Sequence, residues 1–143
     1  MKHILSITLL TLWSNTYAQE WNQRADLSGS PRWGAMGFGI GTKGYICMGT
    51  DGTSNLSDLW EWDQATDTWQ QRAPFPGIAR REGASFTIGN LGYVGFGRTG
   101  VGQSGFSDLW AYDPATDSWE EKASMPAVGR SVPSAFVLDG KAY

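Results

Sequence analysis

The chain has 143 residues, 41% of them hydrophobic, with eight tryptophans, nineteen glycines and a net charge of −3. This length suits about one ordinary domain, and the composition is typical of a globular β protein with many loops rather than a disordered tail. Its charges are scattered and slightly negative in sum, which excludes charge-driven binding to nucleic acid or to an anionic membrane.

Residues 1–18 have the features of a secretory signal peptide. Lys2 gives a positive start, Ile4–Trp13 gives a short apolar stretch, and Thr16 and Ala18 are the small residues that precede a cleavage site before Gln19. An apolar stretch of this length is too short to span the ~30 Å hydrocarbon core of a membrane. We therefore expect cleavage, no membrane span, and a mature protein that is secreted, periplasmic or extracellular.

The mature sequence contains one cysteine, Cys47, and no histidine, because His3 leaves with the signal peptide. These counts exclude an intramolecular disulfide, a Ser-His-Asp triad, a Cys-His pair and a histidine-ligated metal within these residues. Cys47 lies in an apolar run, which favours a buried inert thiol and leaves an intermolecular bridge or a reactive thiol as alternatives. We expect no catalytic residue, no metal and no cofactor.

A segment of twelve residues occurs twice, 50 positions apart. DLWEWDQATDTW at 58–69 and DLWAYDPATDSW at 108–119 agree at eight positions, and each runs into a short tail that ends at Ala73 or Ala123. A third such tail, 21–25, stands alone before the first copy. This period indicates an array of one repeated supersecondary unit.

Each repeat predicts four short antiparallel strands joined by turns rich in glycine, aspartate and asparagine. The expected strands are, in the order first to fourth within a unit, 35–40, 83–88 and 133–138; 44–49 and 92–97; 58–63 and 108–113; 68–72 and 118–122. No stretch shows a sustained period of 3.6 residues, so the fold class is all-β.

The repeated residues resemble kelch repeats, whose pattern has a glycine at the end of the second strand, an Asp-Leu-Trp strand, Asp-x-x-Thr, and a Trp in the fourth strand. The matching residues are Asp58, Leu59, Trp60, Asp63, Thr66 and Trp69, and then Asp108, Leu109, Trp110, Asp113, Thr116 and Trp119. The family usually carries a double glycine after the second strand. Here Met48-Gly49 and Phe96-Gly97 stand in that place, a departure that leaves the fold expectation unchanged.

The resemblance implies an incomplete kelch-type β-propeller over residues 19–143. It would consist of a leading fourth strand at 21–25, two full four-stranded blades at 33–73 and 81–123, and a partial third blade at 131–143. Rings typically have about four to eight blades. We therefore expect an N-terminal fragment whose missing C-terminal blades would complete the ring.

Repeated tryptophans in the third and fourth strands favour packing between blades, whereas Trp33 has Arg81 at its equivalent position and is a candidate for stacking on a sugar. In kelch-like rings the first strand lines the central channel, so an arginine before it in each unit either braces loops or meets a ligand at one mouth. The ligand-binding candidates are Arg32, Trp33, Arg80, Arg81, Glu82 and Arg130.

Two further motifs lie in the loop after the second strand. The acidic and hydroxyl side chains of 51–58 could hold calcium but suit turn formation better, since the EF-hand order and its closing glutamate are lacking. Asn55-Leu56-Ser57 is a glycosylation sequon.

Three function classes remain open, because fold alone does not choose among them. The leading expectation is a secreted binding module that recognises a protein or glycan through loops at one mouth of the propeller. The second is an enzyme on the same scaffold, either similar to sialic-acid epimerases or similar to galactose oxidases. The latter need histidine and tyrosine ligands, which would have to lie in missing sequence. The third is an architectural surface protein.

Overall fold

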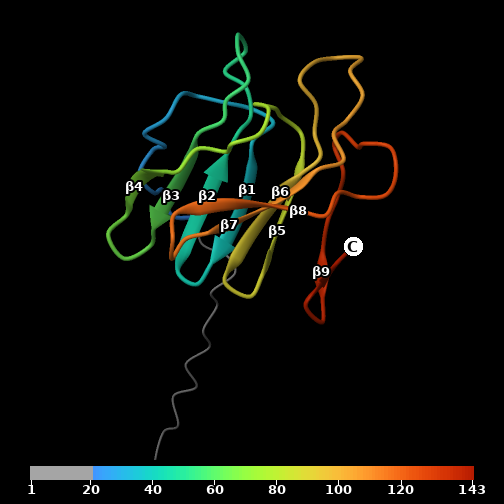
Figure 1. Ribbon diagram of the computed structural model, residues 1–143. Helices are drawn as coiled ribbons and strands as arrows, with labels where there is room; N and C mark the ends of the chain where they lie inside the picture. The colour runs from blue at the N-terminus through green and yellow to red at the C-terminus, as the bar shows by residue number, and fades with distance from the viewer. Residues whose placement is uncertain (1–20) are drawn as a thin grey trace, which may run out of the picture.

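The computed structural model describes residues 21–143, so the expected signal peptide at 1–18 lies outside the described residues. Four strands form a first sheet: β1 (Met36–Ile40), β2 (Lys43–Cys47), β3 (Leu59–Asp63) and β4 (Thr68–Arg72). Four more form a second sheet: β5 (Ala84–Ile88), β6 (Leu91–Gly95), β7 (Leu109–Asp113) and β8 (Ser118–Lys122). A hairpin follows, made of β9 (Val137–Leu138) and β10 (Lys141–Ala142) (Figure 1).

Both large sheets are antiparallel, with their strands side by side in chain order. Three aromatic pairs stack across the first hairpins of the units, with ring centroids 5.0, 5.1 and 5.6 Å apart: Phe38–Tyr45, Phe86–Tyr93 and Phe136–Tyr143. The all-β prediction is confirmed, with two four-stranded blades and a partial third unit. We call these sheets blade one and blade two.

Two segments differ from the strands that the sequence predicts. The first strand of the third unit covers Val137–Leu138 instead of 133–138 and pairs with Lys141–Ala142, and the backbones of Phe136 and Tyr143 exchange hydrogen bonds beyond it. Residues 21–25 form no strand. A fourth strand pairs with the third strand of its own blade, and none of the third strands among residues 21–143 lies beside this segment as a partner.

The missing first glycine of the family pattern has a structural explanation. Met48 and Phe96 have φ angles of 57° and 62°, in the left-handed region that glycine favours. Met48 is fully buried, so its side chain contributes core packing at a backbone position that costs strain. Gly49 must remain glycine, since a Cβ there would lie 2.9 Å from the carbonyl oxygen of Trp33.

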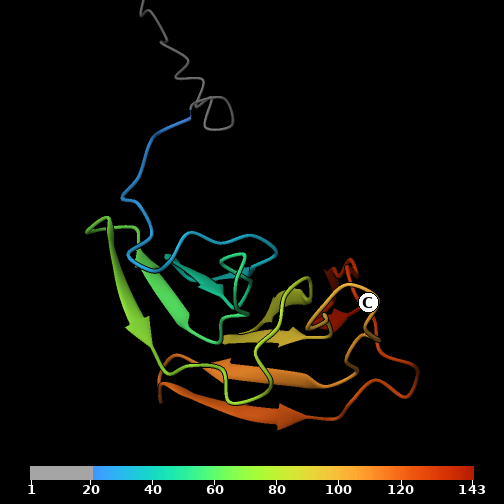
Figure 2. The same ribbon diagram turned by 90° about the horizontal axis from the view of Figure 1, so that it is seen from above.

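The two blades pack flank to flank through their first two strands. The hydroxyl of Ser85 donates to the carbonyl oxygen of Gly37 at 2.6 Å, and the hydroxyl of Thr87 donates to that of Gly39 at 2.7 Å. These bonds place β5 beside β1, as Figure 2 shows from above. The buried core lies between the blades and consists of Met36, Phe38, Tyr45, Cys47, Met48, Leu59, Phe75, Val94 and Tyr112.

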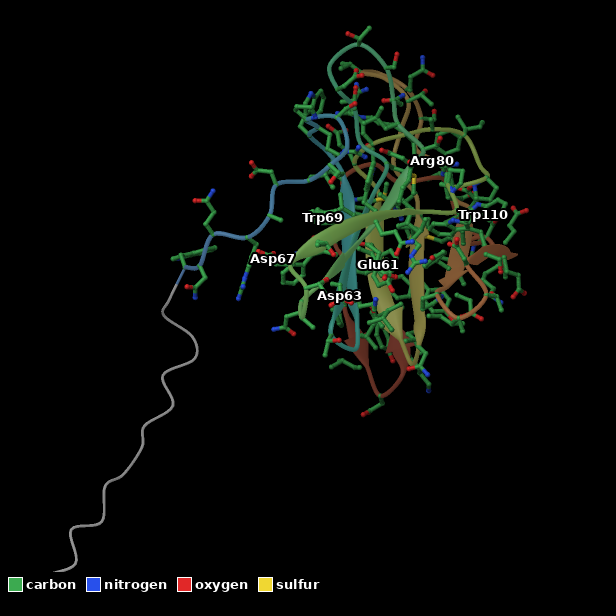
Figure 3. The ribbon with its side chains drawn as sticks, turned by 90° about the vertical axis from the view of Figure 1, so that its left-hand side faces the viewer. Glu61, Asp63, Asp67, Trp69, Arg80 and Trp110 are labelled. Carbon is green, nitrogen blue, oxygen red and sulfur yellow. The ribbon has the colours of Figure 1, made fainter. Side chains whose placement is uncertain are left out.

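The end of one blade's fourth strand is held by the turn and fourth strand of the next. The amide of Ala73 donates to Asp117 at 2.9 Å, and the indole N–H of Trp119 donates to the carbonyl oxygen of Ala73 at 2.9 Å. Ala25 makes the same two bonds with Asp67 and Trp69, at 3.1 and 2.9 Å, where the N-terminal segment passes blade one (Figure 3). Residues 21–25 thus dock on blade one as the end of β4 docks on blade two.

Candidate functional site

The repeated arginines of the first two units, Arg32 and Arg80, each form a salt bridge with an aspartate of the same blade. We call each arginine–aspartate pair a brace. The guanidinium of Arg80 binds both carboxylate oxygens of Asp108, at 2.5 and 2.9 Å, and Arg32 binds Asp58 likewise, at 2.6 and 2.7 Å. Their side chains are only 1% and 4% exposed. Both guanidiniums are used within the fold, so we exclude Arg32 and Arg80 from the candidate site.

This brace explains the repeated Asp-Leu-Trp sequence. The indole N–H of Trp110 donates to Asp108 at 3.0 Å, and Trp60 donates to Asp58 at 2.6 Å. Burial opposes ionisation of each aspartate, but the bonds from arginine and tryptophan outweigh it, so the pKa of both carboxyls lies below its usual value. Leu59, which lies between Asp58 and Trp60 in the sequence, is fully buried in the core.

Arg130, the third repeated arginine, lies on an exposed part of the third unit. Its backbone bonds with Phe106 and accepts from the amide of Gly97 at 2.8 Å, which ties the third unit to the loop between β6 and β7. The position equivalent to Asp108 falls beyond residue 143. The structure does not bring the side chain of Arg130 together with the other candidates.

A second group of residues gathers where the first strands begin. Arg81 lies with its guanidinium carbon 4.9 Å from the ring centre of Trp33, which belongs to the neighbouring blade and is 53% exposed. The Nη1 group of Arg81 donates to the side-chain oxygen of Asn55 at 3.0 Å and to the carbonyl oxygen of Thr99 at 3.2 Å. Asn55 also donates to Thr99 at 2.9 Å, so its sequon amide is engaged in this network.

Glu82 lies beside this pair and accepts from Arg98. That bond lowers the pKa of the Glu82 carboxyl and raises the pKa of Arg98, so both groups are charged at neutral pH. We call Trp33, Asn55, Arg81, Glu82 and Arg98 the mouth cluster. It lies at the end of the blades from which the loops between second and third strands rise (Figure 1).

The backbone of the mouth cluster is strained at one repeated position. Gly34, Glu82 and Val132 have φ angles of 64°, 60° and 55°. This conformation lets each unit bond to the one before it: the amide of Glu82 donates to Gly34 at 2.8 Å, and that of Val132 donates to Glu82 at 2.8 Å. A non-glycine residue here costs about 1 kcal/mol or more, yet Glu82 occupies it.

The mouth positions vary between units, whereas the braces repeat. Equivalent positions carry unlike side chains: Trp33, Arg81 and Ser131; Gly34, Glu82 and Val132; Thr50 and Arg98. Because the backbone is the same in each unit, packing does not demand these differences.

Sequence reasoning found Trp33, Arg81 and Glu82 but missed Asn55 and Arg98 as members of the same site. Neither missed residue recurs between the units, so a search for repeated positions does not find them. Arg98 was open to detection, since Thr50 is its counterpart just after the second strand of blade one.

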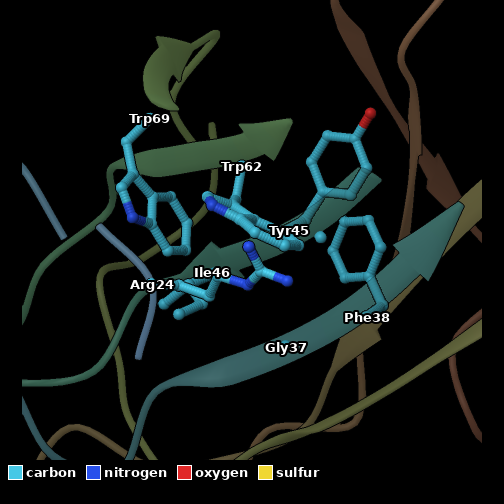
Figure 4. Close-up of a pocket in the computed structure, with 8 residues that line it drawn as sticks. Arg24, Gly37, Phe38, Tyr45, Ile46, Trp62 and Trp69 are labelled. Carbon is cyan, nitrogen blue, oxygen red and sulfur yellow. The ribbon is translucent and has the colours of Figure 1, made fainter. Parts of the chain in front are cut away.

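Hollows lie on the flanks of the blades. One of about 470 Å³ is lined by Gly44, Trp62, Trp69 and Arg24, among others (Figure 4). The same flank of blade two is covered by blade one, with the ring of Phe38 against Gly92. This hollow is therefore a surface for packing another blade, and we do not assign it to a ligand.

Blade one also contains a buried charge cluster that blade two lacks. Glu61 is 3% exposed and accepts from Lys43 at 2.7 Å, from Tyr45 at 2.8 Å and from Arg72 at 2.8 and 3.2 Å. Burial opposes its ionisation, but these donors outweigh burial and lower the pKa of Glu61 to about 2. Ala111 replaces Glu61 in blade two. Because every donor around Glu61 is satisfied, the cluster serves the scaffold.

Other groups in residues 21–143 offer little chemistry. Cys47 is fully buried, which raises the pKa of its thiol to about 12. Asp51 accepts the amides of Thr53 and Ser54 at 2.8 Å each, so it forms a turn in the loop considered for calcium. The described residues contain no group of three or more potential metal ligands, and no helix among them is long and apolar enough to cross a membrane.

Comparisons with known proteins agree with this architecture. A family model described as Kelch motif matches residues 95–126. The solved structure of YjhT, a kelch-type propeller, superposes with a TM-score of 0.67 and 28% sequence identity over 78% of this chain. The chain spans 33% of the length of that protein. A search of curated proteins gave no match. The chain thus carries a kelch motif and has the fold of a kelch-type propeller.

Proposed function

We propose that this protein is an exported binding module that recognises a protein or glycan through the mouth cluster. Its fold is one that serves as a binding module or scaffold. The observation that carries the proposal is the contrast between equivalent positions. Units that share one backbone and one brace carry Trp33, Arg81, Glu82 and Arg98 at the mouth, where no packing requirement explains them.

The composition of the mouth cluster suits binding better than catalysis. Exposed tryptophan and arginine side chains are the types that dominate interface energies. A general acid or base works best with a pKa near the operating pH, whereas the ion pair with Arg98 lowers the pKa of Glu82. The enzyme alternative therefore finds no poised proton donor in this cluster.

A screen of the full-length protein against glycan arrays and arrayed exported proteins tests the proposal. We expect ligands whose binding falls at least tenfold in the Trp33→Ala and Arg81→Gln variants and is unchanged in Arg130→Gln, whose arginine lies outside the mouth cluster. Ligands that bind all variants equally, or no ligand of either kind, would overturn it.

The export part of the proposal rests on the leader-like features of residues 1–18. Expression of the full chain in a bacterial host with a secretion pathway should give a mature N-terminus at Gln19 by terminal sequencing. A protein that keeps Met1 or Lys2 in the cytoplasm contradicts it.

A further inference from the structure

Tyr112 in β7 is a buried phenol that is hydrogen-bonded to a carboxylate. Its side chain is fully buried, and its hydroxyl donates to Asp117 at 2.7 Å. Asp117 itself is exposed, at the turn between β7 and β8. Burial and the bond to Asp117 raise the pKa of the Tyr112 phenol, so it keeps its proton at neutral pH. An oxidised phenol is a strong acid, so a carboxylate at this distance takes the proton as an electron leaves the ring.

Blade one shows that the fold does not require this phenol. Asp67 occupies the position equivalent to Asp117 and accepts from the indole N–H of Trp62 at 2.9 Å. Both aspartates also accept a backbone amide, from Ala25 and from Ala73. The aspartate is therefore a recurring part of the scaffold, whereas the residue that donates to it is an indole in blade one and a phenol in blade two.

An indole connects Tyr112 with the surface. The ring centres of Tyr112 and Trp119 are 5.1 Å apart, which brings the two rings into contact. Trp119 is partly exposed, whereas Tyr112 is not. Tyr45 of blade one also lies beside Tyr112, with 5.8 Å between the ring centres. An electron can therefore leave Tyr112 through Trp119, while the packed rings keep other reactants away from the phenol.

Tyr45 makes a similar bond but has a poorer proton acceptor. Its hydroxyl donates to Glu61 at 2.8 Å. Glu61 is buried and already accepts from two cationic side chains, which lower its pKa to about 2. Asp117 is exposed, so water can carry the proton onward. These differences favour Tyr112 over Tyr45 as the phenol that is oxidised.

We propose that Tyr112 is a redox-active tyrosine, which a one-electron oxidant at the protein surface oxidises through Trp119. The oxidant takes one electron from the indole of Trp119 and is itself reduced by one electron. Trp119 then regains an electron from Tyr112, and the phenol proton moves to Asp117. The products are a neutral tyrosyl radical and a protonated carboxyl group. This activity is independent of binding at the mouth cluster, because Tyr112 lies near the end of β7 that is farther from it.

Photo-oxidation of the full-length protein tests this activity. Light flashes on ruthenium tris-bipyridine with persulfate generate a ruthenium(III) oxidant that removes single electrons, and electron paramagnetic resonance detects the radical in samples frozen after the flash. We expect a tyrosyl signal whose line shape changes when the tyrosines are ring-deuterated. The signal should fall about fivefold or more in Tyr112→Phe, which keeps the ring, and stay unchanged in Tyr93→Phe, whose ring stacks on Phe86 elsewhere in blade two.

Two further variants separate the electron path from the proton acceptor. Trp119→Phe should lower the signal because this oxidant does not oxidise phenylalanine. Asp117→Asn keeps an acceptor oxygen for the phenol but does not take its proton, so the signal should fall there too. Circular dichroism checks the fold of each variant, and Tyr112→Phe decides the assignment alone if Asp117→Asn, which weakens the bond to Ala73, unfolds.

Three results would overturn parts of the proposal. A tyrosyl signal of equal size in the parent chain and in Tyr112→Phe, or an indolyl signal alone in the parent chain, contradicts the assignment to Tyr112. A signal that keeps its size in folded Asp117→Asn contradicts the role of the carboxylate as proton acceptor.

Discussion

Arg80 and Arg81 are neighbours in the chain and have opposite surroundings. Arg80 is 1% exposed, its guanidinium carbon lies 3.7 Å from the ring centre of Phe106, and it binds both oxygens of Asp108. The guanidinium of Arg81 lies over the ring of Trp33, and its buried Nε group has no hydrogen-bond partner among residues 21–143. The first arginine recurs at positions 32 and 130, and the second is replaced by Trp33 and Ser131 in the other units.

This difference shows two roles for residues on the repeated backbone: some stabilise every unit, and others make contacts that are specific to one unit. Residues that every unit needs for folding, such as Arg80 and Asp108, recur with the repeat. Residues at the mouth differ between units, and their side chains contact one another and the loops instead of a partner that recurs in every unit. Recurrence in a repeat protein therefore marks the scaffold, and its loss at a shared backbone position marks a place for specialised contacts.

Removing the partner of Arg80 should have the largest effect on stability. Asp108→Ala leaves a buried guanidinium without its carboxylate, and such losses cost about 3–5 kcal/mol. Urea denaturation of the full chain measures the free energy of unfolding, with the exposed Asp26→Ala as control. A loss below about 1 kcal/mol for Asp108→Ala would show that the brace contributes little.

The buried cluster of blade one should make stability depend on acid. Glu61 has a pKa of about 2 in the fold against its usual 4.5. Its ionisation therefore stabilises the fold fully above pH 4.5, and this contribution of about 3 kcal/mol declines as pH falls through 2. Urea denaturation between pH 6 and pH 2 should show a shallower decline in Glu61→Gln than in the parent chain. Parallel declines would contradict the assignment.

Because of a close contact between the blades, two equivalent glycines should differ in how well they tolerate a side chain. A Cβ on Gly92 would lie 2.0 Å from the ring of Phe38, whereas a Cβ on Gly44 meets nothing nearer than Trp62 at 3.7 Å. We expect Gly92→Ala to cost about 1–3 kcal/mol through overpacking and Gly44→Ala to cost much less. Thermal unfolding of both variants checks this, and equal losses would mean that the blades do not meet as described.

The smallest effect is expected at the strained mouth residue. Glu82→Gly relieves a φ of 60° and loses one ion pair of low value, so stability should stay equal or rise by up to about 1 kcal/mol. Glu82→Ala keeps the strain and should be the less stable of the two variants. This prediction is falsified if the glycine variant is clearly less stable than the alanine variant in urea.

The repeat made most of the fold predictable. Period, turn residues and alternation placed eight strands within one or two residues of their observed bounds, because each strand is built from local hairpin chemistry. Strand 133–138 was overestimated, since its observed bounds are Val137–Leu138, where it pairs with Lys141–Ala142.

The site was harder to predict because its contacts cross between blades. The sequence does not show that Arg81 contacts Trp33, 48 positions earlier, because this contact depends on how the two sheets pack against each other. Likewise, the sequence did not reveal which of the recurring arginines and aspartates form ion pairs with each other. Gly34 at the position of Glu82 was the one local hint of left-handed backbone at the mouth.

Comparing Arg80→Gln with Arg81→Gln tests the central claim most directly. The two changes are chemically identical and one residue apart, so the difference in their free energies of unfolding isolates their surroundings. We predict a loss of about 3 kcal/mol or more for Arg80→Gln and of at most about 1 kcal/mol for Arg81→Gln. Equal losses, or a larger loss for Arg81→Gln, would contradict the division between scaffold and mouth.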